Sequence, residues 1–74
     1  MKTLDKVEKN CAYKIVDFVG EDNDEKRRLW ELGFSRGQTV RVVGKSLLNK
    51  VTLVEVRGYL LSVKTSTLSC VVVK

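Results

Sequence analysis

Side chains that could carry chemistry are few in this sequence. It contains two cysteines, Cys11 and Cys70, and no histidine. The two thiols lie far apart and form no CxxC pair, so the chain lacks the Cys/His spacing of an ordinary zinc site. We expect both cysteines to be small, buried, apolar residues. The sequence therefore predicts no metal site and no cofactor.

Catalytic combinations of residues are also missing. Without histidine, the chain has no nucleophile beside an identifiable base, and its carboxylates form no clustered pair. The 74 residues are enough for one domain, residues 1–74. A domain of this size buries only about 60% of the surface of its unfolded chain, which leaves little room for a deep cleft. We therefore expect a protein that is not an enzyme.

Two glycines four residues apart, Gly33 and Gly37, raise the question of phosphate binding. Their segment, GFSRG, lacks the Lys-Ser/Thr ending of a phosphate-binding loop. Phosphate binds at a helix N-terminus, whereas this segment follows a predicted helix and meets its carbonyl end. We therefore predict a structural corner in which Gly33 caps the helix in a left-handed conformation and Phe34 folds back onto the helix. Gly37 then turns the chain into the next strand.

The helix that ends at this corner is predicted over residues 22–32. Asp22 and Glu25 have the spacing of a capping box, with the Asp22 carboxylate accepting from exposed amides. Two pairs of opposite charge at i,i+4 spacing support the helix. These pairs are Asp24–Arg28 and Arg27–Glu31. A helix of two to three turns is unstable alone, so it must dock its apolar face on a sheet.

Leu29 and Leu32 are three residues apart and define the face of the helix that we expect to point inward. Trp30 lies about 100° from Leu29 around the helix, so it is predicted to be half exposed. Two interpretations of Trp30 stay open. It is either a rim residue that covers the end of the core or an anchor for a binding partner.

Runs rich in β-branched and aromatic residues predict the strands. The expected strands are Cys11–Val19, Arg36–Gly44, a pair within Val51–Lys64 that bends at Gly58, and Cys70–Lys74. The adjacent apolar residues in the first strand favour a bulge or burial on both faces. Short strands joined by short turns hide their edges best by closing on themselves. The predicted fold is mainly β, a small SH3-like antiparallel barrel of about five strands with one short α-helix after the first strand.

Four leucines outside the predicted core are candidates for partner binding, together with Trp30. Leu53 and Leu60 fall on the outward phase of their strands, and Leu47 and Leu48 lie in a loop. A contiguous apolar patch formed by such residues would mark an interface, whereas scattered single leucines would carry no such meaning.

The segment RRLWELGFSRGQTVRVV resembles the hallmark segment of FeoA proteins, small cytosolic partners of the ferrous-iron transporter FeoB. The matching positions are Arg28, Leu29, Leu32, Gly33, Phe34, Gly37, Val40 and Val42, followed by the valine-arginine-glycine turn at Gly58. The resemblance covers essentially the whole chain. Two departures are Asn10, where relatives often have glycine, and the loop KSLLNK, which lacks the Gly/Pro of many relatives.

The resemblance implies an SH3-like barrel and an accessory role in bacterial ferrous iron uptake. It implies a cytoplasmic protein that docks on the cytosolic, GTP-hydrolysing part of a FeoB-like transporter and modulates it. Membrane contact is expected only through that transporter. The alternative is a nucleic-acid-binding small basic barrel, which the net charge of +5 would suit. Because the basic residues are scattered and the aromatic residues dispersed, we expect no nucleic-acid partner.

Overall fold

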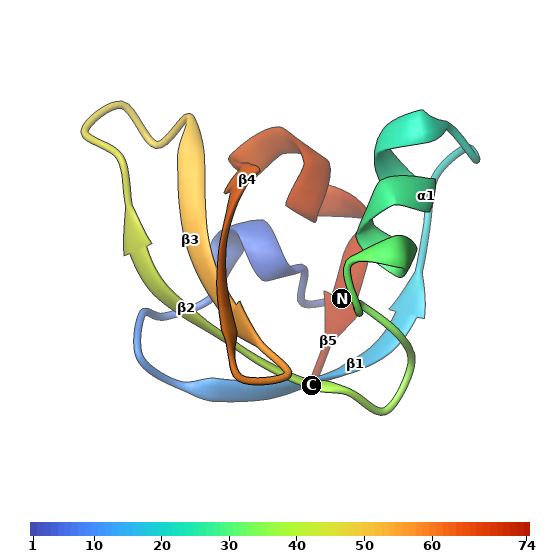
Figure 1. Cartoon of the computed structure of the whole chain (residues 1–74), viewed down its shortest axis with the longest axis horizontal. Helices are drawn as coiled ribbons and strands as arrows, with labels where there is room; N and C mark the ends of the chain where they lie inside the picture. Colours follow the sequence, from blue (N-terminus) through green and yellow to red (C-terminus); the bar gives the residue numbers. More distant parts are fainter.

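The computed structural model describes all residues from 1 to 74. Five antiparallel strands curl around the core and one α-helix lies beside them (Figure 1). The strands are β1 (Ala12–Phe18), β2 (Thr39–Lys45), β3 (Val51–Val56), β4 (Tyr59–Lys64) and β5 (Val71–Val73). The helices are α1 (Asp24–Glu31) and two 3₁₀ helices, η1 (Leu4–Lys6) and η2 (Thr65–Cys70). The predicted class, mainly β with five strands and a short helix after the first, is confirmed.

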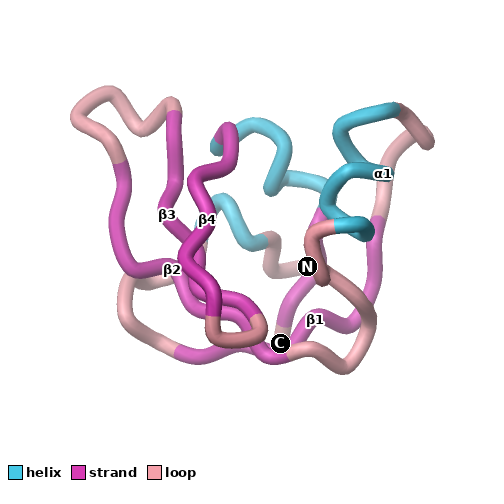
Figure 2. Tube along the Cα trace, in the orientation of Figure 1, coloured by secondary structure: helices cyan, strands magenta, loops and turns pink.

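The strands follow the order β4-β3-β2-β1-β5, so β4 and β5 are the two edges of the sheet. Strand β1 changes partner along its length, because its first half pairs with β2 and its second half with β5. A register shift between Ile15 and Asp17 marks a bulge, which is one of the two alternatives that the sequence leaves open for this strand. The tube in Figure 2 shows how the sheet curls around, with η2 spanning the space between its two edges. The sheet is therefore an open, barrel-like one.

The N-terminal segment covers one edge of the sheet, a feature that the sequence analysis missed. Leu4 and Val7 are buried in the core. Thr3 bridges to Val72, and the amide of Val73 donates to the Lys2 carbonyl at 2.9 Å. Strand β5 is therefore paired on both sides, which leaves β4 as the edge without a partner strand.

The turn between β3 and β4 is the tight one that Gly58 predicts. Val56 pairs with Tyr59, so only Arg57 and Gly58 form the loop. Both have positive φ, 53° and 81°, as a two-residue type I′ hairpin requires.

Helix α1 begins one residue later than the capping-box prediction. Its N-cap is Asn23, whose Oδ1 accepts from the Lys26 amide at 2.8 Å. The capping role predicted for Asp22 is wrong. Its carboxylate instead pairs with the Lys26 ammonium at 3.4 Å. An Asn at this position accepts from the same exposed amides as Asp, so sequence alone does not separate the two.

The charge pairs predicted on α1 are also wrong. Neither i,i+4 pair forms. The side chain of Arg27 approaches Asp24 instead, at 3.8 Å and i,i+3 spacing. Both side chains are solvent-exposed. Because a surface ion pair contributes little to stability, a side chain can exchange one partner for a neighbouring one at little cost in free energy.

The corner after α1 has the predicted conformation. Gly33 has a φ of +108°, which confirms its left-handed cap. Its amide donates to the Trp30 carbonyl at 3.1 Å, and the Phe34 amide donates to the Leu29 carbonyl at 3.0 Å. These are the two hydrogen bonds of a Schellman motif. Phe34 is fully buried, as the prediction that it folds back requires.

Burial corrects two other expectations. Leu29 is buried, but Leu32 is 37% exposed because it is the C-cap residue, where the chain is already leaving the helix. Cys11 was expected to be buried and is exposed, because it precedes β1 instead of lying within it. Cys70 is half buried against the core.

The longest helix, α1, has 8 residues, so none of the helices could span a membrane.

Candidate partner-binding groove

The apolar residues proposed from the sequence for partner binding do not form one patch. Trp30 is on α1, Leu47 and Leu48 are in the loop between β2 and β3, and Leu53 and Leu60 are on β3 and β4. In Figure 1 the β2–β3 loop and α1 lie at opposite ends of the longest axis of the molecule. The structure therefore divides the set into three places.

Trp30 is 41% exposed, the half-exposure that its helical position predicts. Its ring packs edge-on against the Phe18 ring with centroids 5.7 Å apart, and the Lys26 ammonium lies 5.9 Å from its centroid. One part of the ring thus covers the core edge while another part faces solvent. Both the rim and the anchor interpretations stay compatible with this position.

Leu53 and Leu60 are diagonal neighbours on two paired strands, because Leu53 faces Ser62 and Leu60 faces Glu55. Diagonal neighbours on one face of a sheet lie about 7–8 Å apart, within reach of long side chains. Leu60 is 60% exposed, whereas Leu53 is half buried. These two leucines form a small apolar spot on the outer face of the sheet.

A groove separates α1 from the free edge of β4. It has a volume of about 260 Å³. Leu29, Leu32 and Val63 supply its apolar lining. The polar residues around it are Glu25, Arg28, Ser62, Lys64 and Thr67. Three residues of the helical segment that the sequence analysis treated as structural, Arg28, Leu29 and Leu32, therefore line a surface hollow.

The edge of β4 beside this groove presents unpaired backbone groups. In antiparallel pairing, alternate residues bond to the neighbouring strand. The tight turn makes Val56 and Tyr59 a hydrogen-bonded pair. The Thr65 amide donates to the Lys50 carbonyl at 2.9 Å, so the odd-numbered residues from Tyr59 to Thr65 are the ones that bond to β3. The N–H and C=O groups of Leu60, Ser62 and Lys64 therefore point away from β3. They are available to an added strand.

Glu25 closes one end of the groove by linking three elements. Its carboxylate accepts a hydrogen bond from the Thr67 hydroxyl at 2.7 Å and lies 3.8 Å from the Lys64 ammonium. Arg28 lies one helical turn further along the same wall and forms no ion pair. The groove therefore combines an apolar floor with one free guanidinium.

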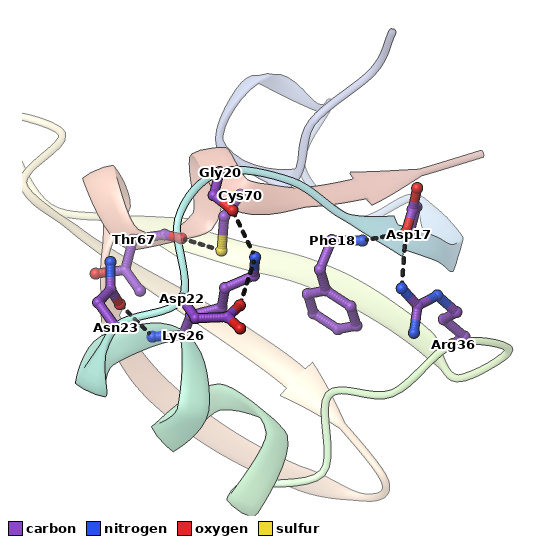
Figure 3. Close-up of polar contacts among 9 residues, drawn as sticks. All are labelled: Asp17, Phe18, Gly20, Asp22, Asn23, Lys26, Arg36, Thr67 and Cys70. Atoms are coloured by element: carbon purple, nitrogen blue, oxygen red, sulfur yellow. Dashed lines mark hydrogen bonds and ion pairs between the residues drawn. The ribbon is translucent and has the colours of Figure 1, made fainter.

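A polar network on the other side of α1 fixes the helix to the preceding loop (Figure 3). The buried Lys26 ammonium donates to the Gly20 carbonyl at 2.9 Å and pairs with Asp22.

The Cys70 thiol donates to the Thr67 carbonyl at 3.1 Å, and burial raises the pKa of that thiol. A raised pKa keeps the thiol protonated and poorly nucleophilic.

Asp17 lies near this network and holds the loop after α1. Its Oδ1 accepts from Arg36 Nη2 at 2.8 Å and from the Phe18 amide at 2.8 Å. The Arg36 hydrogen bond, reinforced by the Phe18 amide, lowers the pKa of this carboxyl. Both contacts favour the charged form, so the pair acts as a structural tie.

Metal-ligating side chains do not gather anywhere in the chain, because no group of three His, Cys, Asp or Glu residues could hold an ion. The one hydroxyl–carboxylate contact in the groove, from Thr67 to Glu25, ties η2 to α1. What the groove offers is an apolar trough beside a row of backbone donors and acceptors. Such a surface can accept an extended peptide by strand addition, with side-chain pockets supplying specificity.

The sequence does not indicate this groove. Its helical period predicts Leu32 in the core, and its short strands predict a closed set, so neither Leu32 nor the edge of β4 is expected to be available. The open edge depends on which strands pair. The N-terminal segment that covers β5 and leaves β4 free carries no strand pattern of its own.

The sequence matches the FeoA domain family over residues 2–74. No protein of curated function matches it. The structure is similar to a FeoA-like protein from Clostridium acetobutylicum, with 26% identity, coverage of 97% of this chain and 83% of that one, and a TM-score of 0.86.

A second similar structure is FeoA from Stenotrophomonas maltophilia complexed with zinc, described as a prokaryotic SH3 domain protein. Identity is 28%, coverage is 100% of this chain and 91% of that one, and the TM-score is 0.84. The FeoA protein from Chlorobium tepidum shares the fold at 22% identity, with 97% and 68% coverage and a TM-score of 0.85. The SH3-like description predicted for the fold is thereby confirmed.

Proposed function

Because this chain belongs to the FeoA family, we propose that it is a non-catalytic accessory protein of ferrous iron uptake that docks on the cytosolic part of a FeoB-type transporter. Docking would place it in the cytoplasm and let it modulate the GTP-hydrolysing domain. The Stenotrophomonas relative is described as a possible activating factor of bacterial ferrous iron transport, which supports this direction.

The observation that carries the proposal is the groove between α1 and the free edge of β4. A binding module without catalytic groups needs a surface that a partner can desolvate. Here exposed Leu32 and buried Val63 lie beside the outward amides of Ser62 and Lys64. An extended segment of the transporter would pair with β4 as a sixth strand and place an apolar side chain against Leu32.

The free guanidinium of Arg28 gives this groove a charge preference. Glu25 is already engaged with Thr67 and Lys64, so Arg28 is the available charged group on the helix wall. Arginine binds carboxylates in a bidentate geometry. We therefore expect the docking segment to carry an acidic residue next to its apolar one.

The test is a pull-down of the purified chain with the soluble GTP-binding domain of the transporter, with and without nucleotide. Leu32→Ser should weaken retention, since it removes the exposed apolar wall of the groove. The control is Leu60→Ser, which removes a more exposed leucine, 60% against 37% for Leu32, from the outer face of β4. Loss of retention with Leu60→Ser but not with Leu32→Ser would move the docking surface to the outer face of the sheet.

A second pair of variants tests strand addition itself. Ser62→Pro removes an outward N–H while leaving the bonds between β3 and β4 intact, and proline is tolerated at such an edge position. Ser62→Ala keeps the amide and serves as the control. The proposal expects the proline variant to lose retention and the alanine variant to keep it. Equal retention of both would rule out pairing at this edge.

A further inference from the structure

The loop between β2 and β3 holds two leucines in solvent. Leu47 is 99% exposed and Leu48 is 72% exposed, so their side chains pack against almost nothing in the folded chain. Exposed single leucines are ordinary, but two consecutive ones at the tip of a projecting loop are not needed for the core. Turn positions of this kind usually carry glycine, asparagine, aspartate or proline.

The loop is an ordered turn whose hydrogen bonds point its central residues outward. The Ser46 amide donates to the Val51 carbonyl at 2.8 Å, and the Asn49 amide donates to the Ser46 carbonyl at 2.9 Å. The Ser46 hydroxyl also accepts from the amides of Lys50 and Val51 at 3.0 and 3.1 Å. Asn49 adopts a φ of +56°, which asparagine tolerates better than most residues.

Two lysines stand at the base of this turn. Lys45 ends β2 and Lys50 precedes β3, so the leucines are flanked by one positive charge on each side. Neither ammonium forms an ion pair, and the contact of Lys45 is a long one of 3.4 Å to the Asp5 carbonyl. Both charges are therefore available to an anionic surface, and the chain as a whole carries a net charge of +5.

We propose that this tip, Leu47 and Leu48 with the flanking Lys45 and Lys50, inserts into the headgroup region of an anionic lipid bilayer. The tip is convex and only two side chains wide, whereas a stable protein interface takes about 800 Å² from each partner. A deformable lipid surface accepts a convex apolar tip, and anionic headgroups attract the lysines that surround it.

The contact would be weak by itself. Two leucines and two lysines fall short of a stable membrane anchor, since even a single acyl chain gives only reversible binding. Such a contact gains importance when a membrane protein already holds the chain near the bilayer, because the second interaction becomes intramolecular. The sequence predicts membrane contact only through the transporter, so this direct contact is an addition to the proposed function and does not depend on it.

The experiment is co-sedimentation of the full chain with vesicles of phosphatidylcholine and phosphatidylglycerol in a ratio of roughly two to one. Wild type should partition onto these vesicles, and added salt should release it. Leu47→Ser combined with Leu48→Ser should lower the partition coefficient roughly tenfold or more. The matched control, Leu60→Ser, changes an exposed leucine away from the tip and should bind as wild type does.

A lysine variant measures the electrostatic contribution to vesicle binding separately from the apolar one. Lys50→Gln should weaken binding to the anionic vesicles by about fivefold, and it should not change binding to pure phosphatidylcholine. The groove variants Leu32→Ser and Ser62→Pro should keep vesicle binding, so failure of the tip and failure of the groove are distinguishable. Absence of wild-type binding to anionic vesicles would overturn the proposal. Equal vesicle binding of wild type and the double serine variant would also overturn it. If the double serine variant lost retention by the transporter but kept vesicle binding, the two leucines would belong to a protein interface instead.

Discussion

Two corners of this chain use apolar residues in opposite ways. After α1, Gly33 turns the backbone with positive φ and Phe34 enters the core, where it is fully buried. Between β2 and β3, Asn49 also has positive φ, yet Leu47 stays almost completely in solvent. Both corners are ordered by backbone hydrogen bonds. What separates them is the surface that each one faces.

The difference teaches where stability and function reside in a small domain. The first corner is fixed from both sides, because a Cβ on Gly33 would lie 2.7 Å from the Arg57 side chain. Its residues support the core and the groove wall. The second corner contributes little burial to the folded chain, so its leucines are free to serve a contact outside it.

Phe34→Ala should have the largest effect on stability. Truncating a fully buried phenylalanine typically lowers the free energy of unfolding by about 3–5 kcal/mol. A domain of this size has little more than that in total. Chemical denaturation should therefore show a large decrease in the denaturant concentration at the unfolding midpoint. A loss similar to that of Leu47→Ala would mean that the corner is not part of the core.

Gly33→Ala should come next, and Gly37→Ala is its matched control. Both glycines have positive φ, so each alanine pays about 1 kcal/mol for the left-handed backbone. Gly33→Ala also meets the side chain of exposed Arg57, which must change rotamer and adds less than about 1 kcal/mol, while Gly37 has open space around it. Thermal denaturation of the two variants measures the difference. If Arg57→Ala does not reduce the excess cost at Gly33, the close contact is not its cause.

Asp17→Asn removes the ion pair with Arg36 near the first corner. Its effect should appear in the pH dependence of the free energy of unfolding. The folded pKa of Asp17 lies below its ordinary value of 3.8, mainly because of Arg36. A depressed pKa contributes stability above the ordinary value, and that stability is lost as the pH falls through the folded pKa. Wild type should therefore lose more stability than Asp17→Asn below pH 3.8. Because the pair is exposed, the difference should shrink in high salt, and identical acid profiles would contradict this role.

Leu47→Ala should have the smallest effect on folding. A side chain that is 99% exposed loses almost no burial when shortened, so the free energy of unfolding should change by less than about 0.5 kcal/mol. Equilibrium denaturation measures this directly. A clear destabilisation would show that the β2–β3 tip packs against the rest of the chain in solution.

Much of the fold could be predicted from the sequence because its determinants are local. The left-handed cap at Gly33 and the tight turn at Gly58 follow from residue types that permit such backbone. The broken alternation in β1 indicates either a bulge or burial on both faces, and the structure has the bulge. These features are set by neighbours in the chain, so they needed no knowledge of tertiary contacts.

The candidate site could not be predicted, because it depends on pairing between distant segments. The helical period places Leu32 beside Leu29, yet the Schellman turn exposes it. Of the two edge strands, β4 is the free one because Thr3 of the N-terminal segment pairs with Val72 in β5, and nothing in the first ten residues indicates that pairing. Likewise, the exposure of Leu47 and Leu48 emerges only when the loop is seen to project.

The most direct test of the docking proposal is amide hydrogen exchange of the chain with and without the soluble domain of a FeoB-type transporter. In the unbound chain, the amides of Leu60, Ser62 and Lys64 point away from β3 and should exchange quickly. The amides of Leu61 and Val63 are hydrogen-bonded to β3 and should exchange slowly. Binding should slow the three outward amides and leave the inward ones unchanged. If the complex forms and these outward amides still exchange at their free rates, the partner docks elsewhere and the groove is not the binding site.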